Sequence, residues 1–196
     1  MLKLQHKTVF ITYATTNSGQ ATAQRFAALG ARIILHDLAG NNNLIQKLLS
    51  DIRAMGARVV TMVTDLNNND TLEAVLKQSL GNLKKIDIIV INPGTASLNL
   101  HLLEFAVDNV ADNGRIIYIM PEEDFKSISG IMDNIRKLAF DNRLRGVTIN
   151  AIIPQNALFT TPTEGIHISD AAEFFASDLS DLISGQSLVI NGILDN

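Results

Sequence analysis

The chain has 196 residues, with 16 lysines and arginines against 20 aspartates and glutamates, and it has no cysteine. The length suits one domain with a substantial core, the missing cysteines exclude disulfides and thiolate metal sites, and the absence of basic runs argues against nucleic-acid binding. The apolar runs are far shorter than the roughly 20 residues that span a bilayer, and the N-terminus has no signal-peptide cleavage pattern. We therefore expect a single domain over residues 1–196, located in the cytoplasm, with no nucleic-acid partner and no membrane partner.

Apolar runs typical of buried strands alternate along the chain with segments of helical period. Gly30 and Gly56 each separate a helical segment from the next strand, where glycine most easily takes the positive φ that ends a helix. Asp70 and Glu73 have the spacing of a capping box. Seven strands are expected, at residues 8–12, 31–36, 58–64, 86–91, 115–120, 147–153 and 187–190.

The strand runs are apolar almost throughout rather than alternating with polar residues, so helices should cover both faces of the sheet. This pattern predicts an α/β fold, a three-layer doubly wound parallel sheet of Rossmann type with about seven strands. The expected strand order is 3-2-1-4-5-6-7. Asp37, Asp65 and the 92–94 segment close successive strands and should meet at one edge of the sheet.

The segment TVFITYATTNSGQATAQRF, at residues 8–26, has the pattern of a strand, a polar turn and a helix. Such a junction can seat a pyrophosphate at the helix N-terminus, where glycines let the backbone approach the anion. The hydroxyls of Thr15, Thr16 and Ser18 could hold an anion there, or they could merely cap the helix. We favour the capping interpretation.

Several motifs resemble those of the short-chain dehydrogenase/reductases and follow one another in that family's order. They are KTVFITYATTNSGQATAQRFAALGARIILHD, VTDLNN, IDIIVINPG, GVTINAIIPQ and AAEFFASDLSDLISGQSLVINGI. The resemblance spans essentially the whole chain, as a divergent and truncated member similar to the 3-oxoacyl-reductase-like enzymes. It implies a Rossmann-like fold, NAD(P)-dependent oxidoreductase chemistry and pairing of subunits through the fourth and fifth helices.

The resemblance implies a dinucleotide site built from the turn and the strand ends. The family's three turn glycines fall on Tyr13, Asn17 and Gly19. Asparagine tolerates the left-handed region, whereas a bulky Tyr13 should force another turn or place its ring near the pyrophosphate path. The implied cofactor-binding residues are Thr12, Asn17, Ser18, Gly19, Asp37, Asp65, Asn92 and Gly94.

Asp37 decides the expected cofactor. A carboxylate at the end of the second strand accepts hydrogen bonds from the ribose hydroxyls and repels a 2′-phosphate, which favours NAD over NADP. In the alternative interpretation Asp37 simply begins a turn.

The resemblance also implies a catalytic tyrosine with a lysine four residues later, which lowers the tyrosine pKa. Counting back from GVTIN places this pair at Asp124 and Ile128, or at Phe125 and Ser129 after a slip of one residue. Neither register supplies it. The sequence therefore predicts no catalytic residue of the family's set.

Further residues bear on catalysis. The family's serine falls on Pro121, which has no hydroxyl, and Tyr118 with Lys126 is the one relocated proton-transfer couple that we weigh. The acidic residues of PEED could be a displaced acid/base pair, but such residues are also ordinary in the first turn of a helix. The four histidines are scattered without ligand-like spacing, so we expect no metal site.

Two segments are shorter than the resemblance implies. The connection at 94–114 allows one short helix, in which Asn99 is expected to cap rather than catalyse, and the substrate lid shrinks to residues 156–168. The expected fifth helix keeps an apolar stripe that could support a homodimer. Its members are Ile128, Ile131, Ile135, Leu138 and Ala139.

Two functions follow as hypotheses. The first is a short-chain dehydrogenase/reductase-like protein that is catalytically degraded and retains residual dinucleotide binding. The alternative is an active NAD-dependent oxidoreductase that uses non-standard catalytic residues on a small carbonyl or alcohol.

Overall fold

The computed structural model describes residues 4–66, 85–92, 100–155 and 162–191. Its sheet has seven strands in the order β3-β2-β1-β4-β5-β6-β7, and every neighbouring pair is parallel. The predicted fold class and strand order are therefore confirmed. The strands are β1 Thr8–Ile11, β2 Arg32–Asp37, β3 Val59–Val63, β4 Ile86–Ile91, β5 Val110–Ile119, β6 Thr148–Gln155 and β7 Ser187–Asn191.

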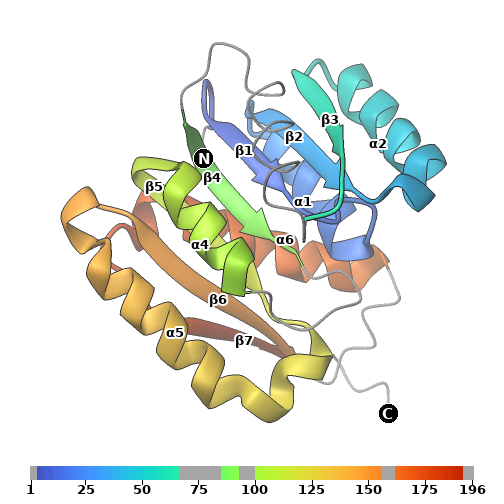
Figure 1. The fold of residues 1–196 in the computed structure, drawn as a ribbon. Coiled ribbons are helices and arrows are strands. Elements are labelled where there is room, and N and C mark those ends of the chain that lie inside the picture. The colour runs from blue at the N-terminus through green and yellow to red at the C-terminus, as the bar shows by residue number, and fades with distance from the viewer. Residues whose placement is uncertain (1–3, 67–84, 93–99, 156–161, 192–196) are drawn as a thin grey trace.

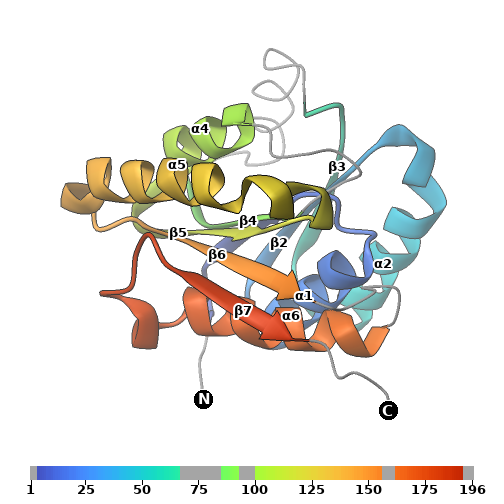
Figure 2. The same ribbon diagram turned by 90° about the horizontal axis from the view of Figure 1, so that it is seen from below.

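Helices cover both faces of this sheet, as Figure 2 shows. The first core cluster joins the sheet to α1 (Asn17–Ala28), α2 (Asn42–Ala54) and α6 (Pro162–Ala176). The second cluster joins the other face to α4 (Leu100–Asn109) and α5 (Ile128–Asp141). Four short 3-10 helices are η1 Ala39–Asn41, η2 Glu122–Ser127, η3 Arg143–Arg145 and η4 Asp178–Ser180.

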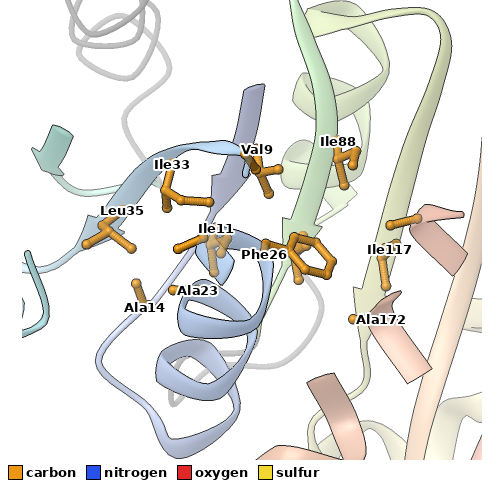
Figure 3. Packing of buried hydrophobic residues seen from close by; sticks show 14 of the residues in the cluster. Val9, Ile11, Ala14, Ala23, Phe26, Ile33, Leu35, Ile88, Ile117 and Ala172 are labelled. Atoms are coloured by element: carbon orange, nitrogen blue, oxygen red, sulfur yellow. The ribbon is translucent and has the colours of Figure 1, made fainter. Parts of the chain in front are cut away.

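The helix α1 shows how the sequence pattern produces the packing. Ala23, Phe26 and Ala27 recur at helical spacing, so all three face the sheet and are buried. Phe26 points from α1 toward the sheet in Figure 3, next to Ile11 of β1, and it has no exposed surface. Burying a phenylalanine side chain stabilises a fold by roughly 1.5–3 kcal/mol, so this contact anchors α1 to the sheet.

The strand boundaries differ from the predictions by a few residues. The largest difference is β5, which begins at Val110 rather than at 115, because Val110 pairs with Ile86 across an irregularity in the ladder. β6 extends through Pro154 to Gln155, which pairs with Asn191 of the edge strand β7. Gly30 and Gly56 take φ values of 90° and 81°, as predicted for helix-ending glycines.

Several predictions concern residues outside the described part of the chain. The capping box at Asp70 and Glu73, the cofactor residue Gly94 and the capping residue Asn99 all lie there. In the described residues, every helix is too short or too polar to cross a bilayer.

Candidate functional site

The polar strand ends meet at the carboxyl edge of the sheet, where β1, β2, β3 and β4 end side by side (Figure 1). Thr12, Asp37 and Asn92 follow or end β1, β2 and β4, and all three are buried. Asp65 follows β3 and is exposed. This is the edge at which doubly wound folds bind nucleotides, so the expected site residues are in the appropriate place.

Asn92 ties the turn after β1 to the end of β4. Its backbone N–H donates to Thr12 Oγ1 at 2.9 Å, and its backbone oxygen accepts from the same hydroxyl at 2.8 Å. The Asn92 side chain accepts from Ser18 Oγ at 2.7 Å and donates to the Tyr13 carbonyl at 2.9 Å and to Thr16 Oγ1. Three of the predicted cofactor residues, Thr12, Ser18 and Asn92, therefore bind one another.

The hydroxyls of the turn divide between two roles. Thr16 is the N-cap of α1, because its Oγ1 accepts a hydrogen bond from Gly19 N at 3.1 Å. The capping interpretation is confirmed for Thr16. Ser18 and Thr15 instead donate to Asn92 and Asp37.

Gly19 lies where α1 approaches the turn most closely. A Cβ built at this position would be 2.7 Å from the Tyr13 carbonyl oxygen and 2.8 Å from Ala14 Cα. Both neighbours are backbone atoms, so they cannot rotate away. Only glycine allows α1 to begin at this distance from the turn.

The left-handed residue of the turn is Tyr13 and not Asn17. Tyr13 has a φ of 45°, whereas Asn17 is the first residue of α1 and is absent from the positive-φ residues of the described chain. The expectation that Asn17 exploits the left-handed tolerance of asparagine was therefore wrong. The turn reverses at Tyr13, and by Asn17 the backbone is already helical.

The Tyr13 ring packs toward the ends of β2 and β3. Its centroid lies 5.4 Å from that of His36, at an interplanar angle of 89°. Burial raises the Tyr13 pKa, and the negative charges of Asp65 and Asp37 raise it further. A tyrosine here has therefore not abolished the turn, and its ring stands near both strand-end acids.

His36 supports the turn by bonding its backbone, a role that the scattered spacing of the histidines did not indicate. It is fully buried, its Nδ1 accepts from Tyr13 N at 3.3 Å, and its Nε2 lies 2.9 Å from the Thr64 carbonyl. These partners require the proton on Nε2, which donates to Thr64. Burial lowers the His36 pKa, so the ring is neutral.

Asp37 is completely buried and accepts four hydrogen bonds from its own chain. Its Oδ2 accepts from Thr15 N at 2.9 Å and from Thr15 Oγ1 at 2.6 Å. Its Oδ1 accepts from Leu38 N at 2.8 Å and from Asn41 Nδ2 at 2.6 Å. Burial acts to raise the Asp37 pKa, but these hydrogen bonds outweigh it and hold the pKa below its usual value. Asp37 thus begins a turn and also holds the loop at Thr15.

The other half of the carboxyl edge, around β5 and η2, contains a different buried pair. Tyr118 on β5 donates a hydrogen bond of 2.7 Å to Asp124 Oδ2 in η2, and both residues are buried. Burial raises the Tyr118 pKa, and the bond to Asp124 raises it further. Tyr118 is therefore paired with Asp124 rather than with Lys126, which is exposed. The structure therefore does not provide the relocated Tyr118–Lys126 proton-transfer couple.

The remaining positions of the expected catalytic set lie before η2, in η2 and in the first turn of α5. Pro121 is buried ahead of η2, Phe125 is partly buried against the second core cluster, and Ile128 begins α5. Ser129, on the first turn of α5, is exposed. Among the described residues, no group of three potential metal ligands comes together.

Comparison with known proteins identifies the family. A model of the short chain dehydrogenases matches residues 7–114. The chain is 25% identical to the (2S)-[(R)-hydroxy(phenyl)methyl]succinyl-CoA dehydrogenase subunit BbsD of Thauera aromatica, with 96% of each chain covered. That alignment has 241 positions and is longer than the 196-residue chain, so the relative carries residues without a counterpart here.

Solved structures share the fold. A short-chain dehydrogenase/reductase from Serratia marcescens superposes with a TM-score of 0.82 at 19% identity, covering 96% of this chain and 98% of the other. The angucycline C-6 ketoreductase LanV, solved with bound NADP, gives 0.82 at 20% identity, covering 97% and 96%. The protein belongs to the short-chain dehydrogenase family.

Proposed function

We propose that this member of the family has lost NAD(P)-dependent carbonyl reduction and alcohol oxidation and retains only a weak affinity for NAD(H). The observation that carries the proposal is the buried Tyr118–Asp124 pair. Asp124 stands at one of the two positions expected for the family's tyrosine, and Ile128 stands at the matching lysine position.

The two tyrosines of the chain support this proposal. A phenol that exchanges a proton with a substrate near neutral pH needs a lowered pKa and access to the substrate. The pKa values of Tyr13 and Tyr118 are both raised, and Tyr118 is buried behind its bond to Asp124. Neither tyrosine is suited to act as the general acid or base.

The cofactor edge fits a dinucleotide poorly in this arrangement. A ribose that binds Asp37 must displace donors already bonded to its two oxygens. If a dinucleotide binds, we expect NAD(H) rather than NADP(H), because a 2′-phosphate would meet the Asp37 carboxylate. Isothermal titration with NADH and NADPH tests this preference, and tighter binding of NADPH would contradict it.

The alternative is an active NAD-dependent oxidoreductase acting on a small carbonyl or alcohol. The relatives favour it, because BbsD is named a dehydrogenase subunit and LanV a ketoreductase with bound NADP. The geometry at Tyr118 weighs against it.

Steady-state absorbance at 340 nm separates the two functions. Purified full-length protein is mixed with NADH or NADPH and a panel of aldehydes and ketones, and with the oxidised cofactors and alcohols, beside an active short-chain dehydrogenase as positive control. We expect no turnover above background, since loss of a positioned general acid alone removes about 10²–10⁴ in rate. Robust turnover would establish the alternative.

We also propose a homodimer. Ile131, Ile135 and Ala139 of the α5 stripe are buried within the protomer, while Ile128 and Leu138 are only partly buried. At the end of α5, Phe140 and Leu144 are 63% and 89% exposed. Sedimentation velocity should give a dimer that Phe140→Glu weakens, and a concentration-independent monomer would contradict it. The single domain and the cytoplasmic location stay predictions.

A further inference from the structure

We infer that Tyr13 fills, with its own ring, the place that the adenosine half of a dinucleotide would occupy, and so controls whether adenine nucleotides bind this chain. The inference rests on the proposed function, in which the carboxyl edge is a remnant dinucleotide site. It adds a ligand class, the adenine nucleotides, and a single residue that weakens their binding.

The position of the Tyr13 ring at the end of β2 supports the inference. In doubly wound folds the acid that ends the second strand binds the ribose of the adenosine, beside the turn after the first strand. Here that acid is Asp37, and the Tyr13 ring packs on its neighbour His36 at a centroid distance of 5.4 Å. The ring is also close enough to Asp37 and Asp65 to feel both charges. It therefore stands at the end of β2, beside the acid that would bind the ribose of an adenosine.

The backbone holds the ring in this place from both sides. The Tyr13 N–H donates to His36 Nδ1 at 3.3 Å, and its carbonyl accepts from Asn92 Nδ2 at 2.9 Å and from Thr16 Oγ1 at 3.0 Å. These bonds fix a φ of 45°, a conformation that is unfavourable for a bulky residue. A residue is held in such a conformation only where its surroundings over-determine it.

The chemistry of the ring suits this substitution. Tyr13 is partly buried and packs against the second core cluster. A phenol ring and an adenine base are both flat, and both offer aromatic faces and edges to their neighbours. The ring already contacts His36 and the second core cluster, and a nucleotide base that took its place would have to displace these contacts.

Three variants test the inference. Tyr13→Gly removes the ring and relieves the left-handed backbone, Tyr13→Ala removes the ring but keeps the backbone constraint, and Tyr13→Phe keeps the ring. Isothermal titration of each full-length protein with AMP and with NAD⁺ is the readout, and thermal denaturation confirms folding. We expect the Gly and Ala variants to bind AMP about tenfold or more tightly than wild type, and the Phe variant to match wild type.

The outcomes are distinct. If Gly and Ala gain nothing while folded, or if they bind AMP more weakly than wild type, the ring does not exclude the nucleotide and the inference fails. A gain for Gly alone would assign the effect to backbone strain and would also overturn it. Cofactor-dependent turnover by the wild-type protein would instead refute the proposed function, whatever the three affinities are.

Discussion

The two halves of the carboxyl edge differ in what has happened to the family's polar groups. Around β1, β2 and β4 the expected side chains are present, but they bind one another: Asp37 holds Thr15, and Asn92 holds Ser18. Around β5 and η2 the expected side chains are missing, and a buried Tyr118–Asp124 pair stands there. One half of the edge therefore keeps the expected residues bonded to one another, while the other half has different residues at the expected positions.

The close contact between α1 and the turn can be tested by adding a side chain at Gly19. In Gly19→Ala the added Cβ would lie within 3.0 Å of three backbone atoms of Tyr13 and Ala14. We expect a loss of about 3 kcal/mol in the free energy of unfolding, measured by urea denaturation, because overpacked backbone cannot relax by rotation.

Gly130→Ala is the matched control for Gly19→Ala. Gly130 is also the third residue of its helix, α5, and a Cβ there meets nothing within 4 Å. Alanine should stabilise this position by roughly 0.5–1 kcal/mol. Equal effects of the two substitutions would show that close approach is not what requires Gly19.

The contribution of the buried Tyr118–Asp124 pair to stability is tested by Tyr118→Phe. Removing the hydroxyl takes one donor from the buried Asp124 carboxylate, and hydrogen bonds to charged groups contribute about 1.5–3 kcal/mol. We expect a loss of about 2 kcal/mol in the same urea measurement. Tyr13→Phe removes a hydroxyl from a partly exposed ring and should stay within about 0.5 kcal/mol.

The buried His36, which bonds the turn after β1, should make the free energy of unfolding depend on pH. Burial lowers the pKa of His36 in the folded protein. Below about pH 6.5 the imidazole therefore binds a proton more readily in the unfolded chain than in the folded one. Stability should be full above that pH and should fall as the pH drops below it, by at most about 1.4 kcal/mol per pH unit.

Two variants assign this slope. His36→Gln should flatten the dependence of the unfolding free energy on pH, whereas His167→Gln, at an exposed position of α6, should retain it. A slope that survives His36→Gln would mean that the buried imidazole does not cause it.

The smallest expected effect is at Thr15. Thr15→Val removes the hydroxyl that donates to Asp37 but keeps the backbone N–H, so we expect a loss of about 1 kcal/mol. Thr15→Ser keeps the hydroxyl and should lose less. If the two variants lose the same free energy of unfolding, the hydrogen bond from Thr15 Oγ1 to Asp37 does not help to stabilise the turn.

The sequence was sufficient for the fold and only partly sufficient for the site. Continuous apolar runs predicted a sheet covered on both faces, and the acids at strand ends predicted which residues meet at its edge. The partners of those acids were not predictable, because the Thr15–Asp37 bond depends on side-chain rotamers and on residues 22 positions apart. The family pattern also misassigned the left-handed residue, since it gives the spacing of the glycines but not the residue at which a substituted turn reverses.

The packing of α6 has a consequence for how the chain acquires its structure. Gly165 lies against the first residue of α1, where a Cβ would come within 2.6 Å of the Asn17 carbonyl oxygen, and α6 completes the core cluster that α1 begins. During synthesis more than a hundred further residues must therefore be added after α1 before α6 is available to cover the apolar face of α1. Contacts of such sequence separation slow folding and leave apolar surface open to aggregation. An N-terminal fragment that contains α1 but lacks α6 would expose that apolar surface when it is expressed alone. Coexpression with the remaining C-terminal fragment should therefore yield more soluble N-terminal fragment than expression of the N-terminal fragment by itself.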